Sequence, residues 1–195
     1  MLLLWLWCGQ AWAAKPDPQA PETYRVHLDT TEGEVVLEVH RRWAPHGADR
    51  FHAMVQTGAL DGAPFFRVIK GFMAQFGIAA NPEVTAVWTP RTLPDDPVTQ
   101  SNTRGRVTFA TSGPNRRTTQ VFVNLADNAF LDGQGFAPFA EVVSGMDAVD
   151  ALFHRFGDAA PRGRGPDQAL LKRDGAAALV GRYRKLDRIL SARVE

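Results

Sequence analysis

The chain has 195 residues, of which 45% are hydrophobic and 22% are charged, a balance that is ordinary for one soluble globular domain. The net charge is only +1 and there is no basic block, so the sequence does not indicate nucleic-acid binding through phosphate neutralisation. Seventeen glycines and 13 prolines favour a fold with many turns over a helical bundle.

The first 13 residues resemble a secretory signal peptide. An apolar run over 2–7 is followed by Ala-Trp-Ala, which predicts cleavage after Ala13, although no Lys or Arg precedes the run. Two alternatives fit less well: the run is too short for a membrane anchor, and bulky Trp7 disfavours a lipoprotein at Cys8. We therefore expect a periplasmic or secreted protein with no stable membrane insertion after cleavage.

Cys8 is the only cysteine, and it lies inside that segment. The mature domain would then have no thiol, which excludes structural disulfides, cysteine nucleophiles and cysteine-ligated zinc together. The five histidines show no metal-ligand spacing, and Asp95–Asp96 lies in a Pro-rich stretch that is not typical of catalytic carboxylates. The sequence predicts no metal and no cofactor.

The first predicted elements are a linker, a hairpin and a helix. Residues 14–22 read as a Pro-rich, exposed linker before a domain over 23–195. Apolar residues alternate over 24–28 and predict a half-buried strand, which a turn over 31–34 joins to a second strand over 35–39. Helical spacing after Pro45 predicts a short amphipathic helix that ends near Gly58.

The rest of the chain predicts more short strands and few helices. An aromatic-rich segment over 65–76 reads as one strand, and the Pro-rich segment 81–99 reads as a long loop. Further strands are expected at 107–111, 120–124, 139–143 and 186–194, and helices at 145–156 and 167–184, where Gly175 and Gly181 weaken the second. Many short strands in one domain predict a closed β-barrel with helices capping its ends.

Three blocks of sequence resemble the cyclophilin family. Residues 65–77, FFRVIKGFMAQFG, match the family signature F-x-R-[IV]-I-x-G-F-M-x-Q-x-G. NTRG at 102–105, FATSGPN at 109–115 and TQVFVN at 119–124 form the second block, and FLDG at 130–133 with FAEVVSGMDAV at 139–149 the third. The blocks keep the family's order and spacing. The resemblance implies a closed eight-stranded antiparallel barrel capped by two α-helices, with a C-terminal helical extension from about residue 158.

The resemblance also implies a peptidyl-prolyl cis–trans isomerase. Such an enzyme lowers a barrier near ~20 kcal/mol by binding the twisted amide more tightly than the planar one. By resemblance, Arg67 donates to the prolyl nitrogen and Gln75 organises it, and the even spacing would place both on one face of a strand. The residues expected to bind substrate are Phe72, Met73, Ala110, Gln120, Phe122, Phe130, Leu131 and Phe136.

Two aromatic positions depart from the best-known eukaryotic members. Phe130 stands where they have Trp, and Phe136 where they have His. The first change removes an indole N–H donor, so weaker cyclosporin binding is expected. The second removes a polar contact near the pocket.

Several alternatives stay open at this stage. Outside the motif, Arg67 would be an ordinary solvated residue, and Phe72, Met73 and Phe122 would be plain core. The chain could be an active isomerase of unfolded or exported proteins, or a non-catalytic, proline-peptide-binding chaperone of the same fold. A carbohydrate- or lipid-binding barrel would need an open lumen. We expect a monomer that binds proline-containing polypeptides.

Overall fold

The computed structural model describes residues 16–195, so the predicted signal peptide lies outside the described residues. The strands are β1 (Thr23–Thr30), β2 (Gly33–His40), β3 (Arg67–Ile69), β4 (Met73–Phe76), β5 (Arg106–Phe109), β6 (Val121–Asn124), β7 (Pro138–Ser144) and β8 (Ile189–Val194). The helices are α1 (Pro45–Gln56), α2 (Pro82–Trp88), α3 (Met146–Ala151) and α4 (Gln168–Asp174), with 3-10 turns η1 (Ala129–Gln134) and η2 (Gly175–Leu179).

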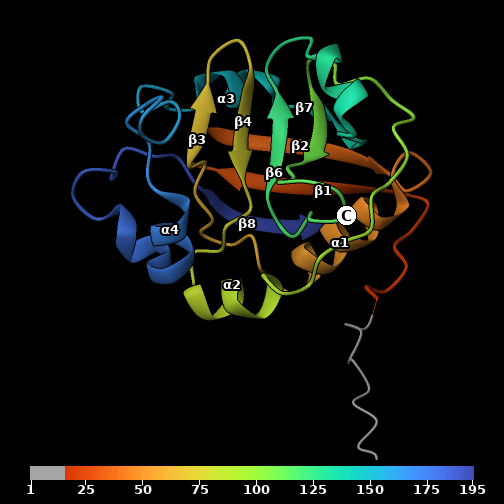
Figure 1. Ribbon diagram of the computed structural model, residues 1–195, viewed down its shortest axis with the longest axis horizontal. Coiled ribbons are helices and arrows are strands. Elements are labelled where there is room, and N and C mark those ends of the chain that lie inside the picture. The colour runs from red at the N-terminus through yellow and green to blue at the C-terminus, as the bar shows by residue number, and fades with distance from the viewer. Residues whose placement is uncertain (1–15) are drawn as a thin grey trace, which may run out of the picture.

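All eight strands join one antiparallel sheet, in the order β3-β4-β6-β5-β7-β2-β1-β8, which confirms the expected strand number and direction. The sheet curls, so that β3, β4 and β6 run across β1, β2 and β8 (Figure 1). The ladder is not closed by strand pairing. At the seam, Phe65 N–H donates to the Asp187 carbonyl at 2.8 Å, and Ile189 N–H to the Ala63 carbonyl at 2.9 Å. The expected closed barrel is thus a curled sheet, and hydrogen bonds between the irregular segment 62–65 and residues 187–189 bridge its seam.

The interior of the curled sheet is filled by side chains. Phe51 from α1 packs on Phe139 with ring centroids 5.1 Å apart, and Phe109 also packs on Phe139 at the same distance. These three rings are almost fully buried, and burying each is worth roughly 1.5–3 kcal/mol. Helix α1 packs against β2, β7 and β8, and α3 against β2, which confirms two capping helices. A filled interior does not fit the lumen-binding alternative.

The segment expected as one strand over 65–76 is two strands. The chain turns at Gly71, whose φ of +74° is a conformation that favours glycine, and Phe72 N–H closes the turn on the Ile69 carbonyl at 2.9 Å. Arg67 and Gln75 therefore face each other across an antiparallel pair. They come together by register between neighbouring strands, and the expectation of one face of a single strand is wrong.

The loop expected over 81–99 contains helix α2. Asn81 caps this helix, because its side chain accepts from the Glu83 N–H at 2.9 Å, and Pro82 occupies the first turn. Trp88 is buried against the main core at its other end. The helix is only seven residues long, too short for its apolar spacing to stand out among four prolines.

The two later helices are shorter than expected. Helix α3 ends at Ala151, and α4 ends at Asp174, ten residues before the predicted end at 184. Gly175 stops α4: its φ is +57°, and a Cβ there would lie 2.1 Å from the Ala80 carbonyl oxygen. Ala176 N–H donates to that same carbonyl at 2.8 Å, so the C-terminal extension docks beside α2.

The described part of the expected linker, 16–22, is mostly exposed, as its composition predicts, but two of its residues anchor it. The side chain of Asp17 is 4% exposed and accepts from Arg50 Nε and from Arg91 Nη2, each at 2.6 Å. Ala20 is buried in the main core. The segment is part of the domain, held by ion pairs between residues far apart in sequence.

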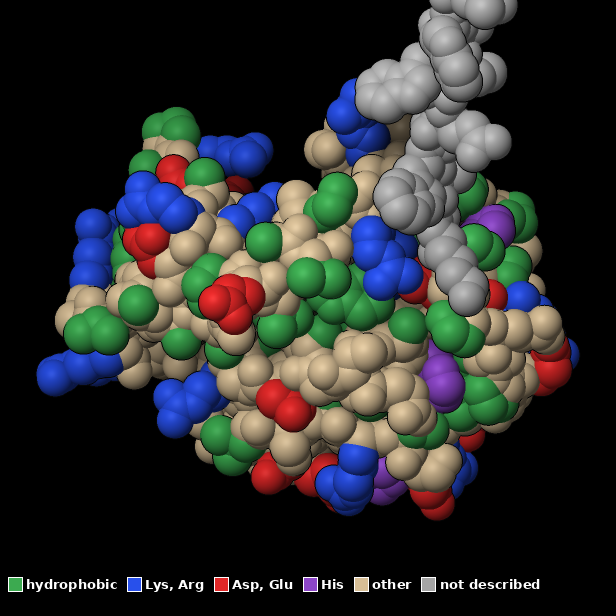
Figure 2. All heavy atoms as spheres, turned by 90° about the horizontal axis from the view of Figure 1, so that it is seen from below, with side chains coloured by type: hydrophobic (Ala, Val, Ile, Leu, Met, Phe, Trp, Pro, Cys, Tyr) green, Lys and Arg blue, Asp and Glu red, His purple; other side chains and the backbone are tan. Residues whose placement is uncertain are grey.

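Charged side chains of both signs are interspersed with apolar ones on the face seen from below in Figure 2. Large apolar side chains that are well exposed lie on separate elements: Val87, Phe130, Val143, Val180 and Leu190. Within 16–195, no helix has the length and apolar character needed to cross a bilayer.

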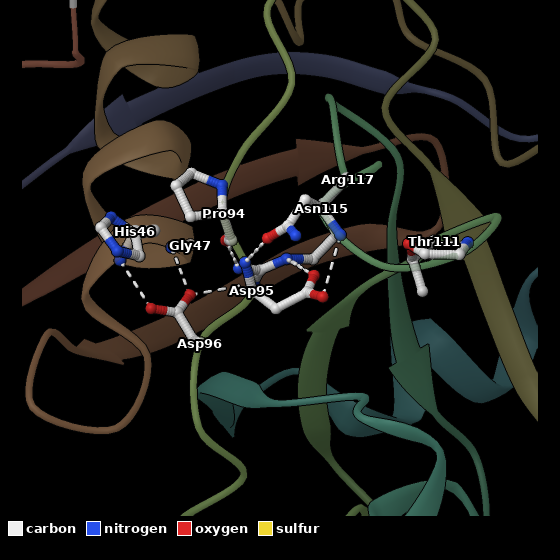
Figure 3. A network of polar contacts seen from close by, with 9 residues as sticks. His46, Gly47, Pro94, Asp95, Asp96, Thr111, Asn115 and Arg117 are labelled. Atoms are coloured by element: carbon white, nitrogen blue, oxygen red, sulfur yellow. Dashed lines mark hydrogen bonds and ion pairs between the residues drawn. The ribbon is translucent and has the colours of Figure 1, made fainter.

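A buried polar network ties the segment after α2 to α1 (Figure 3). Asp96 accepts from the backbone N–H groups of His46 and Gly47, both at 2.9 Å, at the first turn of α1. Arg117 donates to Asp96 at 2.9 Å and to the Pro94 carbonyl, and both charged side chains are at least 98% buried. The N-cap residue of α1, Ala44, makes no side-chain hydrogen bond. Asp96 therefore supplies the anionic cap at the N-terminus of this helix.

We predict that Asp96→Asn lowers the free energy of unfolding by about 3 kcal/mol, because it removes the carboxylate that is hydrogen-bonded to the buried Arg117 and leaves only Asp95, 3.6 Å away. Urea denaturation followed by circular dichroism measures this. The comparison is Asp95→Asn, which removes that longer contact with Arg117 and an acceptor for the Asn115 N–H; this carboxylate is 40% exposed, so its loss should cost only about 1 kcal/mol. Equal losses in the two variants would contradict this account.

Candidate active site

One groove, of about 520 Å³, contains nearly all of the predicted site. It runs over β3, β4 and the start of β6, with η1 on one side and α4 on the other. Nine of the ten predicted residues line it: Arg67, Phe72, Met73, Gln75, Ala110, Gln120, Phe122, Leu131 and Phe136. The whole lining extends from Arg67 to Lys172, so segments that are far apart in the chain meet in one groove.

A relay of three polar side chains crosses the floor of the groove. Arg67 Nη1 donates to Gln75 Oε1 at 3.1 Å, and Gln75 Nε2 donates to Gln120 Oε1 at 2.8 Å. Gln75 is almost completely buried, and both ends of its amide are engaged, so it can hold only one orientation. The relay directs Arg67 along the groove.

A fourth residue, which the sequence did not point to, completes this relay. Asp158 accepts from Arg67 Nε at 2.9 Å and from Nη2 at 3.1 Å, a bidentate ion pair. Burial raises the pKa of Asp158, but the hydrogen bonds and charge of Arg67 outweigh it and hold that pKa below its usual range. The carboxylate is therefore ionised at neutral pH.

Beside the relay lies an apolar pocket that is separate from the main core. Met73, Phe122 and Leu131 form its buried base, and Phe72 and Phe136 are half-buried around it. The ring of Phe136 meets Phe122 edge-on, with centroids 5.9 Å apart. These residues thus pack against one another and also form the apolar wall of the groove.

Phe130 is the predicted site residue that does not line the groove. Its side chain is 61% exposed and stacks on Phe72, with centroids 6.0 Å apart and an interplanar angle of 23°. The tight turn of η1 directs Leu131 into the pocket and its neighbour Phe130 outward. Phe130 therefore covers the outer side of Phe72 at the rim.

Buried amides hold the loops that carry the pocket. Asn102 Nδ2 donates to the Phe136 carbonyl and to Asp132 Oδ1, both at 2.8 Å, and Asn128 Nδ2 donates to the Phe72 carbonyl at 2.8 Å. Burial raises the pKa of Asp132, and hydrogen bonds from Ser101 and Asn102 bring it below its usual value. These contacts fix η1 and the β3–β4 turn relative to the sheet.

The remaining lining side chains are hydroxyl, basic and amide groups that sequence reasoning did not assign. They are Thr89, Thr92, Thr111, Ser112, Arg116, Thr118, Arg162, Gln168 and Lys172. Most lie outside the three motif blocks, at the end of α2, in the turn before β6 or in the C-terminal extension. No local pattern marks them, because their place in the groove depends on how these segments dock.

Among the described residues, Glu38, His40 and Glu141 form a group whose spacing could hold a metal ion. It is not in the groove lining. Arg25 pairs with Glu38 at 3.2 Å and Arg106 pairs with Glu141 at 2.9 Å, so the protein already neutralises both carboxylates. Asp158 is the one described carboxylate that lines the groove.

The groove thus combines a permanent cationic donor, Arg67, with an apolar pocket beside it. A family model described as cyclophilin type peptidyl-prolyl cis-trans isomerase/CLD matches residues 25–165. The chain belongs to this family, and its enzyme class is peptidyl-prolyl cis–trans isomerase.

Curated bacterial relatives carry the same name. The chain is 34% identical over 135 residues to the peptidyl-prolyl cis-trans isomerase cyp18 of Streptomyces antibioticus, covering 65% of this chain and 81% of the relative. It is 35% identical over 145 residues to peptidyl-prolyl cis-trans isomerase A of Dickeya dadantii, covering 72% and 76%.

Solved structures share the fold. A Cryptosporidium parvum cyclophilin type peptidyl-prolyl cis-trans isomerase superposes with a TM-score of 0.65 at 18% identity, covering 89% of this chain and 98% of that one. A cyclophilin from Hirschia baltica gives 0.62 at 19% identity, covering 89% and 77%.

Phe122 and Val123 are neighbours on β6, and they pack on opposite sides of the sheet. We predict that Phe122→Leu weakens binding of a Xaa-Pro peptide about tenfold, equivalent to about 1.4 kcal/mol, because it opens the pocket wall. Isothermal titration measures this. The matched control Val123→Ala removes core contacts, and should lower the melting temperature while leaving affinity unchanged. If both variants lose affinity equally, the separation of pocket and core is wrong.

Proposed function

We propose that this groove catalyses rotation about X–Pro bonds of unfolded or exported proteins, with Arg67 as the donor to the prolyl nitrogen. One observation carries the proposal: Arg67 is hydrogen-bonded to Gln75 in the same groove as an apolar pocket that is separate from the main core. A crystal structure of the Cryptosporidium parvum relative was determined in the presence of the dipeptide Ala-Pro, which supports a proline ligand for such a groove.

The chemistry requires no bond to be broken in the σ framework. As the amide twists it loses resonance, and the lone pair on the prolyl nitrogen becomes available to accept a hydrogen bond. A donor that is already in place then binds the twisted amide more tightly than the planar one, and this difference lowers the barrier. Arg67 suits this role because its charge is permanent and it offers several N–H groups at once.

The pocket supplies the second requirement. Phe122, Met73 and Leu131 form an apolar base that can hold the proline ring while the preceding carbonyl swings. Gln120 and Ala110 also line the groove, and substrate backbone would run along them. All these groups come from one chain, so a monomer suffices for the reaction.

The non-catalytic chaperone remains the competing function, and the relatives give it no support because they are named as isomerases. We predict that Arg67→Ala lowers kcat/KM at least about a hundredfold, the effect of losing about 3 kcal/mol from one fixed donor. A protease-coupled assay on a Xaa-Pro tetrapeptide measures this.

The matched control for that variant is Arg104→Ala, which removes an arginine that pairs with Asp150 at the surface, outside the groove. It should leave kcat/KM unchanged, and both variants should keep the wild-type melting temperature within a few degrees. An Arg67→Ala enzyme with full activity would refute the donor assignment. A wild-type protein without activity would favour the chaperone.

We also propose that the protein is exported and cut after Ala13. The apolar run, the Ala-Trp-Ala pattern and a thiol-free sequence over 14–195 support this. Cleavage there would keep Asp17 and its buried ion pairs in the mature domain. In a bacterial host with a secretion pathway, mass spectrometry of the periplasmic protein should find Ala14 as the first residue. Intact protein confined to the cytoplasm would oppose export.

A further inference from the structure

We propose that Asp158 is a positioning residue for catalysis, which fixes the guanidinium of Arg67 so that its free N–H on Nη2 points into the groove. The inference rests on the proposed donor role of Arg67, and extends the site to a residue outside the sequence motifs. Asp158 lines the groove with its carboxylate directed at Arg67.

A count of donors shows what the ion pair leaves free. Arginine carries five N–H bonds. Asp158 occupies the one on Nε and one on Nη2, and Gln75 occupies one on Nη1. The second N–H of Nη1 faces Met73 Sδ, a weak acceptor, at 4.0 Å. One N–H, on Nη2, therefore remains free. The contacts with Asp158 and Gln75 fix the plane of the guanidinium, and this N–H is left to meet an acceptor.

Asp158 is itself held on a compact loop. The Gly165 N–H donates to the Asp158 carbonyl at 2.8 Å, and a Cβ on Gly163 would lie 2.1 Å from that carbonyl oxygen. The Ala159 N–H donates to Asp158 Oδ1 at 2.8 Å, so one carboxylate oxygen is fixed by backbone as well as by Arg67. The loop closes around Asp158 only because glycine stands at its closest approach.

The C-terminal extension supports this loop from behind. Tyr183 Oη donates to the Gly165 carbonyl at 3.3 Å, and its ring meets Phe156 edge-on with centroids 5.2 Å apart. A chain of contacts thus runs from the extension through the loop and Asp158 to Arg67. This gives the extension a part in the active site beyond the groove residues of α4.

A flexible arginine must lose side-chain freedom each time that it meets the twisted amide. The ion pair with Asp158 removes that freedom before substrate arrives. The saved entropy cost therefore lowers the free energy of the transition state more than it strengthens substrate binding. The opposite role is also conceivable for a carboxylate here, since it could compete with substrate for the donor. The two roles predict opposite changes in rate.

The test compares Asp158→Ala, Asp158→Asn and wild type in the protease-coupled assay. We expect Asp158→Ala to lower kcat about tenfold with little change in KM, equivalent to about 1.4 kcal/mol. Asn keeps the shape and one acceptor oxygen, so Asp158→Asn should lose about threefold. The matched control Asp150→Ala removes a surface carboxylate that pairs with Arg104, and should keep the wild-type kcat.

A second readout reports the ion pair without any activity. In ¹⁵N NMR spectra, the Arg67 Nε–H of wild type should give a resonance protected from solvent exchange, assigned by its loss in Arg67→Ala. It should lose protection in Asp158→Ala and stay protected in Asp150→Ala. This measurement does not require activity, so it can be made even if the wild-type protein is inactive. It therefore separates failure of the proposed isomerase function from failure of the proposed ion pair between Asp158 and Arg67.

Gly163→Ala provides a variant that leaves both side chains of the pair intact. Its Cβ must displace the Asp158 carbonyl, so we expect the same loss of Nε–H protection and the same direction of change in kcat. Unchanged or higher kcat in Asp158→Ala, with the fold intact by circular dichroism, would overturn the proposal. If Asp158→Ala does not fold, the isosteric Asp158→Asn and Gly163→Ala decide by the same criteria.

Discussion

The hydrogen bond between Arg67 and Gln75 depends on register, and most of the site depends on that bond. The two residues lie opposite each other only because β3 turns back at Gly71 and pairs with β4 in one alignment. A slip of one residue between these strands would put Arg67 and Gln75 on opposite faces of the sheet. On its other side β4 pairs with β6, where Gln75 lies opposite Phe122, and this register brings the polar side chains and the apolar pocket side by side.

The sheet performs two tasks with alternate residues of the same strands. On β6, Val123 packs into the filled interior and Phe122 faces the groove. A filled interior makes the wall of the groove stiff, because closely packed side chains leave little room to move. Catalysis by a fixed donor requires such stiffness, since a donor that must reorganise gives up part of its advantage. The core thus contributes to function without touching substrate.

Much of the fold and most of the groove could be predicted from local sequence. Alternation over 24–28, the turn after it and the contiguous motif at 65–77 each depend on neighbours in the chain. The eight strands came from the family resemblance and the structure has them, and nine of the ten residues named from that resemblance line one groove. The failures have a common physical cause. Asp17, Asp96 and Asp158 each act through an arginine far away in sequence, at 50, 117 and 67, and such pairs leave no periodic trace. Gly175 reads locally as a weak helix residue, yet its effect comes from the Ala80 carbonyl against which it packs.

The pairing of β1 with β8 has a consequence for how the chain is made. His27 and Glu195, hydrogen-bonded at that edge, are 168 positions apart. While the ribosome is still adding the last strand, β1 can pair only with β2, and one edge of the sheet stays bare. The seam at 62–65 also forms only after residues 187–189 have been made, because its partners are Asp187 and Ile189. The nascent domain therefore cannot complete its sheet or its seam until β8 has been synthesised.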